Sequence, residues 1–337
     1  MATNNSSVTI RKKAGAAGLS VMCCLDGSRM SNLAFGVAAR LRGKGSMHVL
    51  HVSDPDKPGL PGHLNPDYLR DLFELNCAKY AIPSRNWAVE VIERAPAEDG
   101  PDGAKEPVRN VIHAVAVEQR PDVVVLGAFG RKGAQPSIWG NGSNTDWSAR
   151  TLETTTAIVK SGVRGFSEFL NERSRWVCCF DGSQRSVQGV EFALASLRPD
   201  LGDELLLLHV LEEADPRSGW RQAGNANQLD AKTAMLHDVA EKVQAAAANG
   251  AASEEAAARA RGAVSLALVD RNPNAPIGQQ IAQFAAQSEA TFLVVGVDGM
   301  SAWENSNGNF DKFLGESFGS ISDYVVRHAR CVIVVAK

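Results

Sequence analysis

The feature that most constrains this chain is an internal repeat. Val21–Ser28 reads VMCCLDGS and Val177–Ser183 reads VCCFDGS, which matches Asp26 to Asp181. Three further pairs of segments follow in the same order: 49–52 (VLHV) and 207–210 (LLHV), 123–130 (VVVLGAFG) and 292–299 (FLVVGVDG), and the runs that open with Gly142-Ser143 and Gly319-Ser320. Because the order is kept and the spacing between partners only grows, the second copy is the first with insertions.

The repeat divides the chain into two domains of similar size. A chain of 337 residues is too long for one average domain and suits two α/β cores of roughly 150 residues each. Residues 1–17 are polar and contain no acidic side chain, and we expect a short disordered tail there rather than a transit peptide. We expect the first repeat over 18–162, a linker over 163–174 and the second repeat over 175–337.

Short apolar runs alternate with amphipathic stretches in each repeat, which is typical of βα units. Apolar runs without alternation, such as VVVL at 123–126, indicate parallel strands that are buried on both faces. The Ala-rich stretch 226–260 is expected to form two helices or one broken helix. In the first repeat we expect strands near 19–25, 47–52, 87–93, 122–127 and 155–160, and helices near 30–42, 66–80, 106–119 and 144–152. The pattern predicts an α/β fold with two tandem, doubly wound, parallel five-stranded sheets that are Rossmann-like.

Composition and charge exclude several classes of partner. The net charge of −3 and the pI near 6.2 show no basic excess that would favour nucleic acid or an anionic membrane. No window approaches the roughly 20 apolar residues of a membrane helix, and the first residues lack the apolar core of a secretory signal. The six cysteines lack the spacing of a zinc or thioredoxin motif, so we expect buried, reduced thiols and no metal site. We expect a cytoplasmic protein.

A glycine-rich turn follows the fourth expected strand of the first repeat and leads into a helix. Glycines leave backbone N–H groups unobstructed, and with the helix dipole such a turn favours a phosphate. An ordinary strand-to-helix turn is the alternative, and the position after the fourth strand favours phosphate binding. The candidate binding residues of this turn are Gly127, Gly130, Arg131, Gly140, Gly142 and Ser143.

Asp26 and Gly27 follow the first strand, at the edge where open α/β sheets bind ligands. A carboxylate there can accept hydrogen bonds from ribose hydroxyls or from the adenine amino group. The alternative for Asp26 is a helix N-cap, but Ser28 is the better cap, which leaves Asp26 for a ligand. His51 ends the second strand and is interpreted as a packed strand residue rather than a catalyst.

Together these motifs resemble the universal stress protein family, twice, over about 19–161 and 175–337. The resemblance implies a fold like that of the adenine nucleotide alpha hydrolases and, in ATP-binding members, the signature G-x2-G-x9-G-[ST]. The spacing of Gly127, Gly130 and Gly140 fits this signature, whereas the hydroxyl of Ser143 comes two residues late. The resemblance also implies that the backbone of Val52 meets the adenine ring and that Asp26 faces the nucleotide.

The second repeat keeps most of these positions but departs in one spacing. Nineteen residues separate Gly299 from Gly319, and this enlarged loop is rich in carboxylates, which oppose a triphosphate unless a metal bridges them. We expect a degenerate or differently tuned site here and the better site in the first repeat. The matching candidates are Asp181, Val210, Gly296, Gly299, Gly319 and Ser320.

The leading hypothesis is a stress-response or signalling protein that binds an adenine nucleotide, ATP or AMP, with Mg²⁺ only as the nucleotide brings it. No Walker motif, nucleophile elbow or general base is recognisable, so at most slow ATP hydrolysis is expected. The alternative is a nucleotide-free structural or partner-binding pseudodimer. In this family two domains usually pair through their final strands, here 154–160 and 331–337, and a further homodimer is left open. An ATP pyrophosphatase would need a Ser-Gly-Gly-x-Asp-Ser loop, which neither first strand carries.

Overall fold

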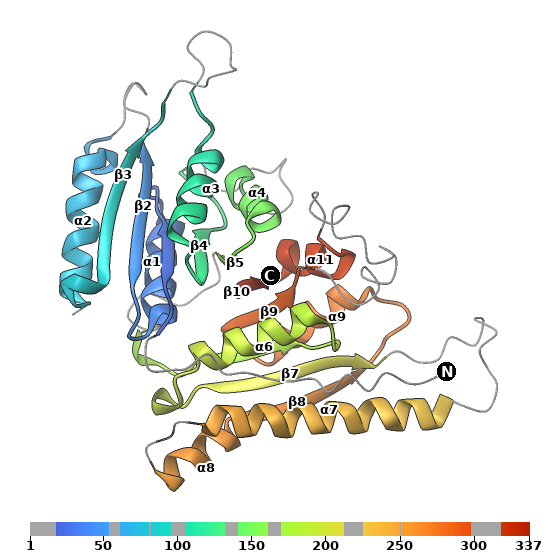
Figure 1. Cartoon of the computed structure of the whole chain (residues 1–337). Coiled ribbons are helices and arrows are strands. Elements are labelled where there is room, and N and C mark those ends of the chain that lie inside the picture. Colours follow the sequence, from blue (N-terminus) through green and yellow to red (C-terminus); the bar gives the residue numbers. More distant parts are fainter. Residues whose placement is uncertain are drawn as a thin grey trace.

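The structure is a computed structural model that describes residues 18–53, 61–80, 82–95, 105–131, 141–160, 170–211, 225–249, 251, 253–297 and 318–337. The expected tail over 1–17 lies outside these residues, as does most of the expected linker. Figure 1 shows two α/β units whose sheets meet in the middle of the molecule.

The first repeat alternates strands and helices as its sequence predicts. Ser28 caps the first helix by accepting a hydrogen bond from the N–H of Ser31, and Asn65 caps the second by accepting from Asp67. The elements are β1 (Val21–Cys24), α1 (Arg29–Arg42), β2 (Met47–Ser53), η1 (Gly62–Leu64), α2 (Pro66–Lys79), η2 (Ser84–Asn86), β3 (Trp87–Glu93), α3 (Val108–Gln119), β4 (Val123–Gly127), α4 (Ser143–Thr151) and β5 (Thr155–Val159).

The second repeat follows the same plan with a longer helical insertion. Its Ala-rich stretch forms two helices, and Ser253 caps the second by accepting from the N–H of Ala256. The elements are β6 (Arg175–Cys179), α6 (Gln184–Ser196), η3 (Pro199–Leu201), β7 (Glu204–Leu211), α7 (Asn225–Ala248), α8 (Glu254–Gly262), β8 (Val264–Asp270), α9 (Ile277–Gln287), β9 (Phe292–Gly296), α11 (Ser320–His328) and β10 (Val332–Ala336).

Each repeat contributes a parallel, doubly wound sheet. The strand order is β3-β2-β1-β4-β5 in the first repeat and β10-β9-β6-β7-β8 in the second. Neighbouring side chains of β1 point to opposite faces: Cys23 belongs to the cluster with Phe35 of α1 and Phe73 of α2, whereas Met22 belongs to the cluster with Ile112 of α3. Helices therefore cover both faces, which explains why these strands are apolar without alternation.

The two sheets merge into one ten-stranded sheet because the final strands pair. β5 and β10 run antiparallel, with Ile158 opposite Ile333 and Ala157 opposite Val334. All four side chains are fully buried. The expected intrachain pairing through the final strands is thus confirmed (Figure 1).

One lysine at the end of each final strand contacts the end of the last helix of the other repeat. Lys160 Nζ donates to the carbonyl oxygens of Val326 and Arg327, the latter at 3.1 Å, near the end of α11. Lys337 Nζ donates to the carbonyl oxygen of Leu152, which directly follows α4. Basic side chains are favourable at helix C-termini, where carbonyl groups lack intrahelical partners.

Lys160 is expected to make the stability of this junction depend on pH. Burial lowers the pKa of Lys160 from its usual 10.5 to about 8. Between these values the unfolded chain binds more protons than the folded one, so the free energy of unfolding rises with pH across this window. Between about pH 7 and pH 11 the free energy of unfolding of Lys160→Met should rise by about 3 kcal/mol less than that of the wild type. Urea unfolding of both proteins at several pH values measures it, and parallel profiles would contradict the prediction.

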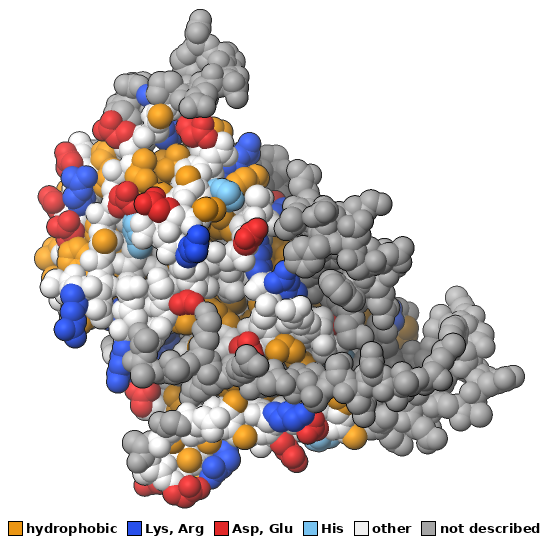
Figure 2. Space-filling model, in the orientation of Figure 1, with side chains coloured by type: hydrophobic (Ala, Val, Ile, Leu, Met, Phe, Trp, Pro, Cys, Tyr) orange, Lys and Arg blue, Asp and Glu red, His pale blue; other side chains and the backbone are white. Residues whose placement is uncertain are grey.

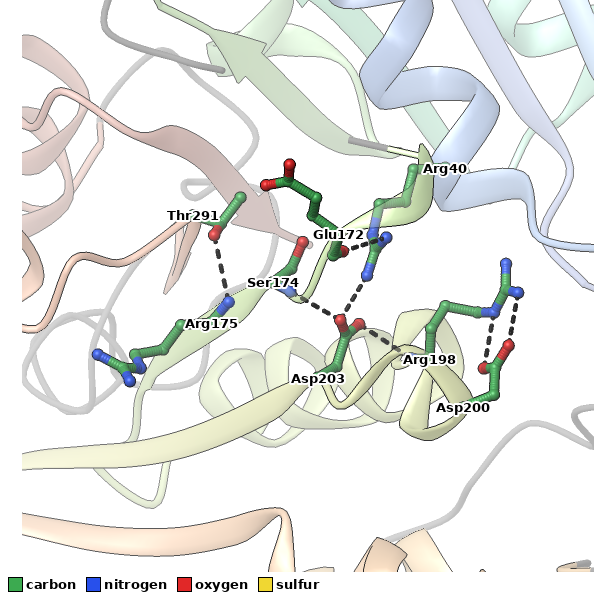
Figure 3. Close-up of polar contacts among 8 residues, drawn as sticks. All are labelled: Arg40, Glu172, Ser174, Arg175, Arg198, Asp200, Asp203 and Thr291. Atoms are coloured by element: carbon green, nitrogen blue, oxygen red, sulfur yellow. Dashed lines mark hydrogen bonds and ion pairs between the residues drawn. The ribbon is translucent and has the colours of Figure 1, made fainter. Parts of the chain in front are cut away.

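A buried ion pair joins the repeats beside the linker (Figure 3). Arg40, near the end of α1, pairs with Asp203, which directly precedes β7. Arg40 also donates to the carbonyl oxygen of Glu172 at 3.0 Å. Asp203 accepts from the backbone N–H of Ser174 at 2.8 Å and of Arg198 at 2.9 Å. The four bonds fix the first helix of one repeat against the start of the other.

Charge is spread rather than concentrated over the described surface. On the face in Figure 2, acidic and basic side chains are interspersed. None of the described helices has the length and apolar character needed to cross a bilayer. The cysteines are free, as expected, and burial raises the pKa of Cys23 and Cys178.

Candidate functional site

The candidate site lies where the strand order of the first repeat reverses. β1 and β4 are neighbours, but the chain continues from β1 toward β2 and from β4 toward β5. The loops that follow two such strands diverge and leave a crevice at the carboxyl edge of the sheet. The structure brings Asp26, in the loop after β1, together with Arg131, in the turn after β4.

Two hydrogen bonds hold these two loops together, and a third orders the loop after β1. Asp26 Oδ1 accepts from the N–H of Ser28 at 3.0 Å, and Asp26 Oδ2 accepts from the N–H of Arg131 at 2.9 Å. Arg131 Nε donates to the carbonyl oxygen of Asp26 at 2.6 Å. As expected, Ser28 rather than Asp26 caps α1. Both carboxylate oxygens of Asp26 nevertheless have backbone partners, so a ligand at the Arg131 amide competes with this carboxylate.

Gly130 lies at the close approach of the two loops. A Cβ atom at this position would lie 2.7 Å from Asp26 Oδ2. Gly27 has a φ of +80°, which favours glycine, and Gly182 adopts nearly the same conformation in the second repeat with a φ of +89°. The loop after the first strand is therefore built in the same way twice.

The helix that follows the glycine-rich turn, α4, has Gly142 as its N-cap and Ser143 as its first residue. The N–H of Gly142 donates to the carbonyl oxygen of Ala128 at 2.6 Å, and Thr145 Oγ1 donates to that of Gly127 at 2.8 Å. Gly142 has no side chain with which to cap α4, and none of the described side chains makes this capping hydrogen bond. Gly140 lies outside the described residues. Eleven residues separate Gly130 from Gly142, so this turn is two residues longer than the family signature.

The second repeat starts its last helix by the same contacts, despite the enlarged loop. The N–H of Gly319 donates to the carbonyl oxygen of Val297 at 3.0 Å, and Ser322 Oγ donates to that of Gly296 at 2.6 Å. Ser320 thus corresponds to Ser143 as the first helical residue. Gly299 and the carboxylates of the enlarged loop lie outside the described residues.

The remaining described candidates of the second repeat, Asp181 and Val210, lie where Asp26 and Val52 lie in the first. Asp181 Oδ1 accepts from the N–H of Ser183 at 2.9 Å, as Asp26 does from Ser28. Val52 and Val210 lie near the carboxyl ends of β2 and β7, and both are half-buried.

In each repeat, one histidine contacts the loop that carries the aspartate. His51 Nδ1 lies 2.7 Å from the carbonyl oxygen of Leu25, and His209 Nδ1 lies 2.6 Å from that of Phe180. The carbonyl groups can only accept, so Nδ1 carries the proton in each ring. Burial lowers the pKa of His51, and the Arg131 charge adds to this effect. Both histidines are packed residues, as expected for His51, and each holds the residue that directly precedes the aspartate.

Sequence patterns did not single out two further residues, one near the end of α4 and one directly before its start. Arg150, in α4, donates to Asp146 at 2.9 Å and to Asp323 of α11 at 2.7 Å. Its guanidinium lies over the ring of Phe318, 4.6 Å from the ring centre. Asn141, directly before Gly142, is buried. The burial of Asn141 and the contact of Arg150 with Asp323 do not follow from a local pattern, because both arise only in the folded chain.

Comparison with known proteins gives a consistent picture of both repeats. Residues 20–159 and 173–337 match the Universal stress protein family. A universal stress protein from Archaeoglobus fulgidus DSM 4304 has a similar solved structure, with a TM-score of 0.54, 18% identity, and coverage of 95% of this chain and 97% of that chain. A functionally unknown protein from Pseudomonas aeruginosa PAO1 gives a TM-score of 0.58 at 11% identity, with coverage of 96% and 94%. The comparison with curated proteins gave no match.

Proposed function

The chain belongs to the universal stress protein family, and from this premise we propose that it binds an adenine nucleotide, ATP or AMP, as a stress-response or signalling module. The observation that carries the proposal is the junction of Asp26, Arg131 and the start of α4 at the point where the strand order reverses. The proposed activity is binding, with at most slow ATP hydrolysis.

The residues of the first repeat fit the chemistry of a nucleotide. The start of α4 supplies backbone N–H groups and a positive helix end for phosphates, and the Arg131 guanidinium adds a full charge. Asp26 would accept hydrogen bonds from the ribose or the adenine amino group, and the backbone of Val52 would contact the base. A Cβ atom at residue 130 would fill the space beside Asp26, so glycine at this position keeps the turn open.

The merged sheet favours a second candidate function, in which the pseudodimer acts as a scaffold for a protein partner without nucleotide. β5 and β10 pair antiparallel within one chain. A dimer of single domains would need two chains to form the same strand pairing. A nucleotide-binding test separates the two functions, because a scaffold needs no response to ATP.

Gly130→Asp is expected to abolish stabilisation by nucleotide. ATP at about a hundredfold excess over its dissociation constant should raise the free energy of unfolding by about 2.7 kcal/mol. The new carboxylate would start from a Cβ that lies 2.7 Å from Asp26 Oδ2, and would displace the turn and repel phosphate. Thermal unfolding with and without ATP or AMP measures the loss.

Gly262→Asp is the matched control, since it adds the same charge where a Cβ atom meets nothing within 4 Å. This variant should keep the full ATP response. An equal response in the two variants would place the nucleotide elsewhere, and an unchanged melting temperature of the wild type in millimolar ATP and AMP would favour the scaffold. Gly142→Asp tests the first repeat and Gly319→Asp tests the second. Gly142→Asp should reduce the stabilisation by ATP more than Gly319→Asp does.

A further inference from the structure

Asn141 carries a buried side-chain amide that has no partner within the part of the chain that the structure describes. The residue is 4% exposed, and neither Nδ2 nor Oδ1 makes a hydrogen bond there. Burial of an amide without hydrogen bonds is unfavourable, and native proteins avoid it at nearly all positions. An amide of this kind beside a candidate anion site indicates that a bound molecule supplies the partner.

The backbone places Asn141 beside the glycine-rich turn. It directly precedes Gly142, whose N–H is bonded to the carbonyl oxygen of Ala128. A Cβ atom on Gly142 would lie 3.4 Å from that oxygen and 3.9 Å from the nitrogen of Gly130. The backbone of Asn141 therefore lies where the end of β4, Gly130 and the start of α4 meet.

The second repeat shows that the fold does not require a polar residue at this position. The counterpart of Asn141 is Phe318, which directly precedes Gly319 and is 7% exposed. Phe318 packs in an apolar cluster with Val325, and Arg150 covers its ring. The following glycine makes the same backbone hydrogen bond in both repeats. A buried amide at residue 141 therefore serves something other than the start of the helix.

We propose that Asn141 is a nucleotide-binding residue that makes the first repeat the better phosphate site. This inference rests on the proposed function. The side-chain Nδ2 of Asn141 donates a hydrogen bond to a phosphate oxygen beside the N–H groups of α4. An amide N–H is a neutral donor, and a phosphate oxygen can only accept. Phe318 offers no such donor, so the second repeat lacks this contact although its backbone is arranged in the same way.

Asn141→Leu is the central test, since leucine has a similar size and resembles the apolar side chain of the second repeat. The affinity for ATP, and for tripolyphosphate as a phosphate probe, should fall about tenfold. The melting temperature without ligand should stay the same or rise, because an unpartnered buried amide is removed. Asn141→Asp should weaken binding further, because a carboxylate repels phosphate. Titration calorimetry and thermal unfolding provide the two readouts.

Ser148→Ala is the matched control, because Ser148 in α4 is also fully buried with an unpartnered hydroxyl. It lies beyond the first turn of the helix and should leave the affinity unchanged. Wild-type affinity in Asn141→Leu would overturn the inference and leave the proposed function standing. A lower melting temperature without ligand in Asn141→Leu would also overturn it, since Asn141 would then support the fold. A wild type that binds neither ATP nor tripolyphosphate would overturn both.

Discussion

Arg40→Ala is expected to lower the free energy of unfolding by about 3–5 kcal/mol. Arg40 and Asp203 are only 2% and 1% exposed. Removal of the guanidinium leaves the Asp203 carboxylate buried without its counter-charge, although the N–H groups of Ser174 and Arg198 still donate to it. Urea unfolding followed by circular dichroism measures the loss.

An exposed ion pair provides the control for this prediction. Arg261 and Glu254 of α8 pair at 2.5 Å, with side chains 45% and 85% exposed, so Arg261→Ala should cost less than about 1 kcal/mol. Addition of Asp203→Asn to Arg40→Ala should recover part of the loss, because the side-chain oxygen of asparagine still accepts from an N–H and carries no charge. Equal losses in Arg40→Ala and Arg261→Ala would contradict a buried, charge-dependent junction.

The buried pair occurs once and breaks the symmetry of the repeat. When Ser28 is matched to Ser183, the position of Arg40 falls on Ala195. The ion pair therefore cannot form a second time with the roles exchanged. We infer that it selects one relative orientation of the repeats, whereas strand pairing alone is close to symmetric.

Trp176→Ala should be as damaging as the loss of Arg40, at about 3–5 kcal/mol. Trp176 in β6 is fully buried and lies opposite Phe292 in β9, with ring centres 4.0 Å apart and planes at 9°. The ring centre of Phe192 in α6 lies 6.4 Å from that of Trp176. Truncation to alanine leaves a cavity between two strands and a helix that cannot close without distorting the sheet.

Trp176→Phe is the informative companion of the alanine variant. Trp176 Nε1 is buried and makes no hydrogen bond in the described structure, so phenylalanine keeps the aromatic contact and removes an unpartnered N–H. The expected loss is at most about 2 kcal/mol. Urea unfolding compares the variants. A loss in Trp176→Phe equal to that in Trp176→Ala would show that the indole N–H has a partner essential to the fold.

The strands and the helices could be predicted from sequence because each depends on a local pattern, whereas the pairing of the repeats was implied by the resemblance to a family. Continuous apolar runs gave β1 and β4, and the glycine after Ala248 and Asn249 marked the break between α7 and α8. Ser28 could be identified as a cap because a hydroxyl before a helix bonds within three residues. The repeat itself indicated two domains before any contact was known.

Only the tertiary structure showed which of these residues touch. The bond between Asp26 and Arg131 spans 105 residues, and that between Arg40 and Asp203 spans 163. No local pattern encodes such partners, because they meet only after the strands are ordered in the sheet. The same holds for the burial of Asn141. Local propensity thus determined the elements of this protein, whereas long-range packing decided which polar groups are satisfied and which remain for a ligand.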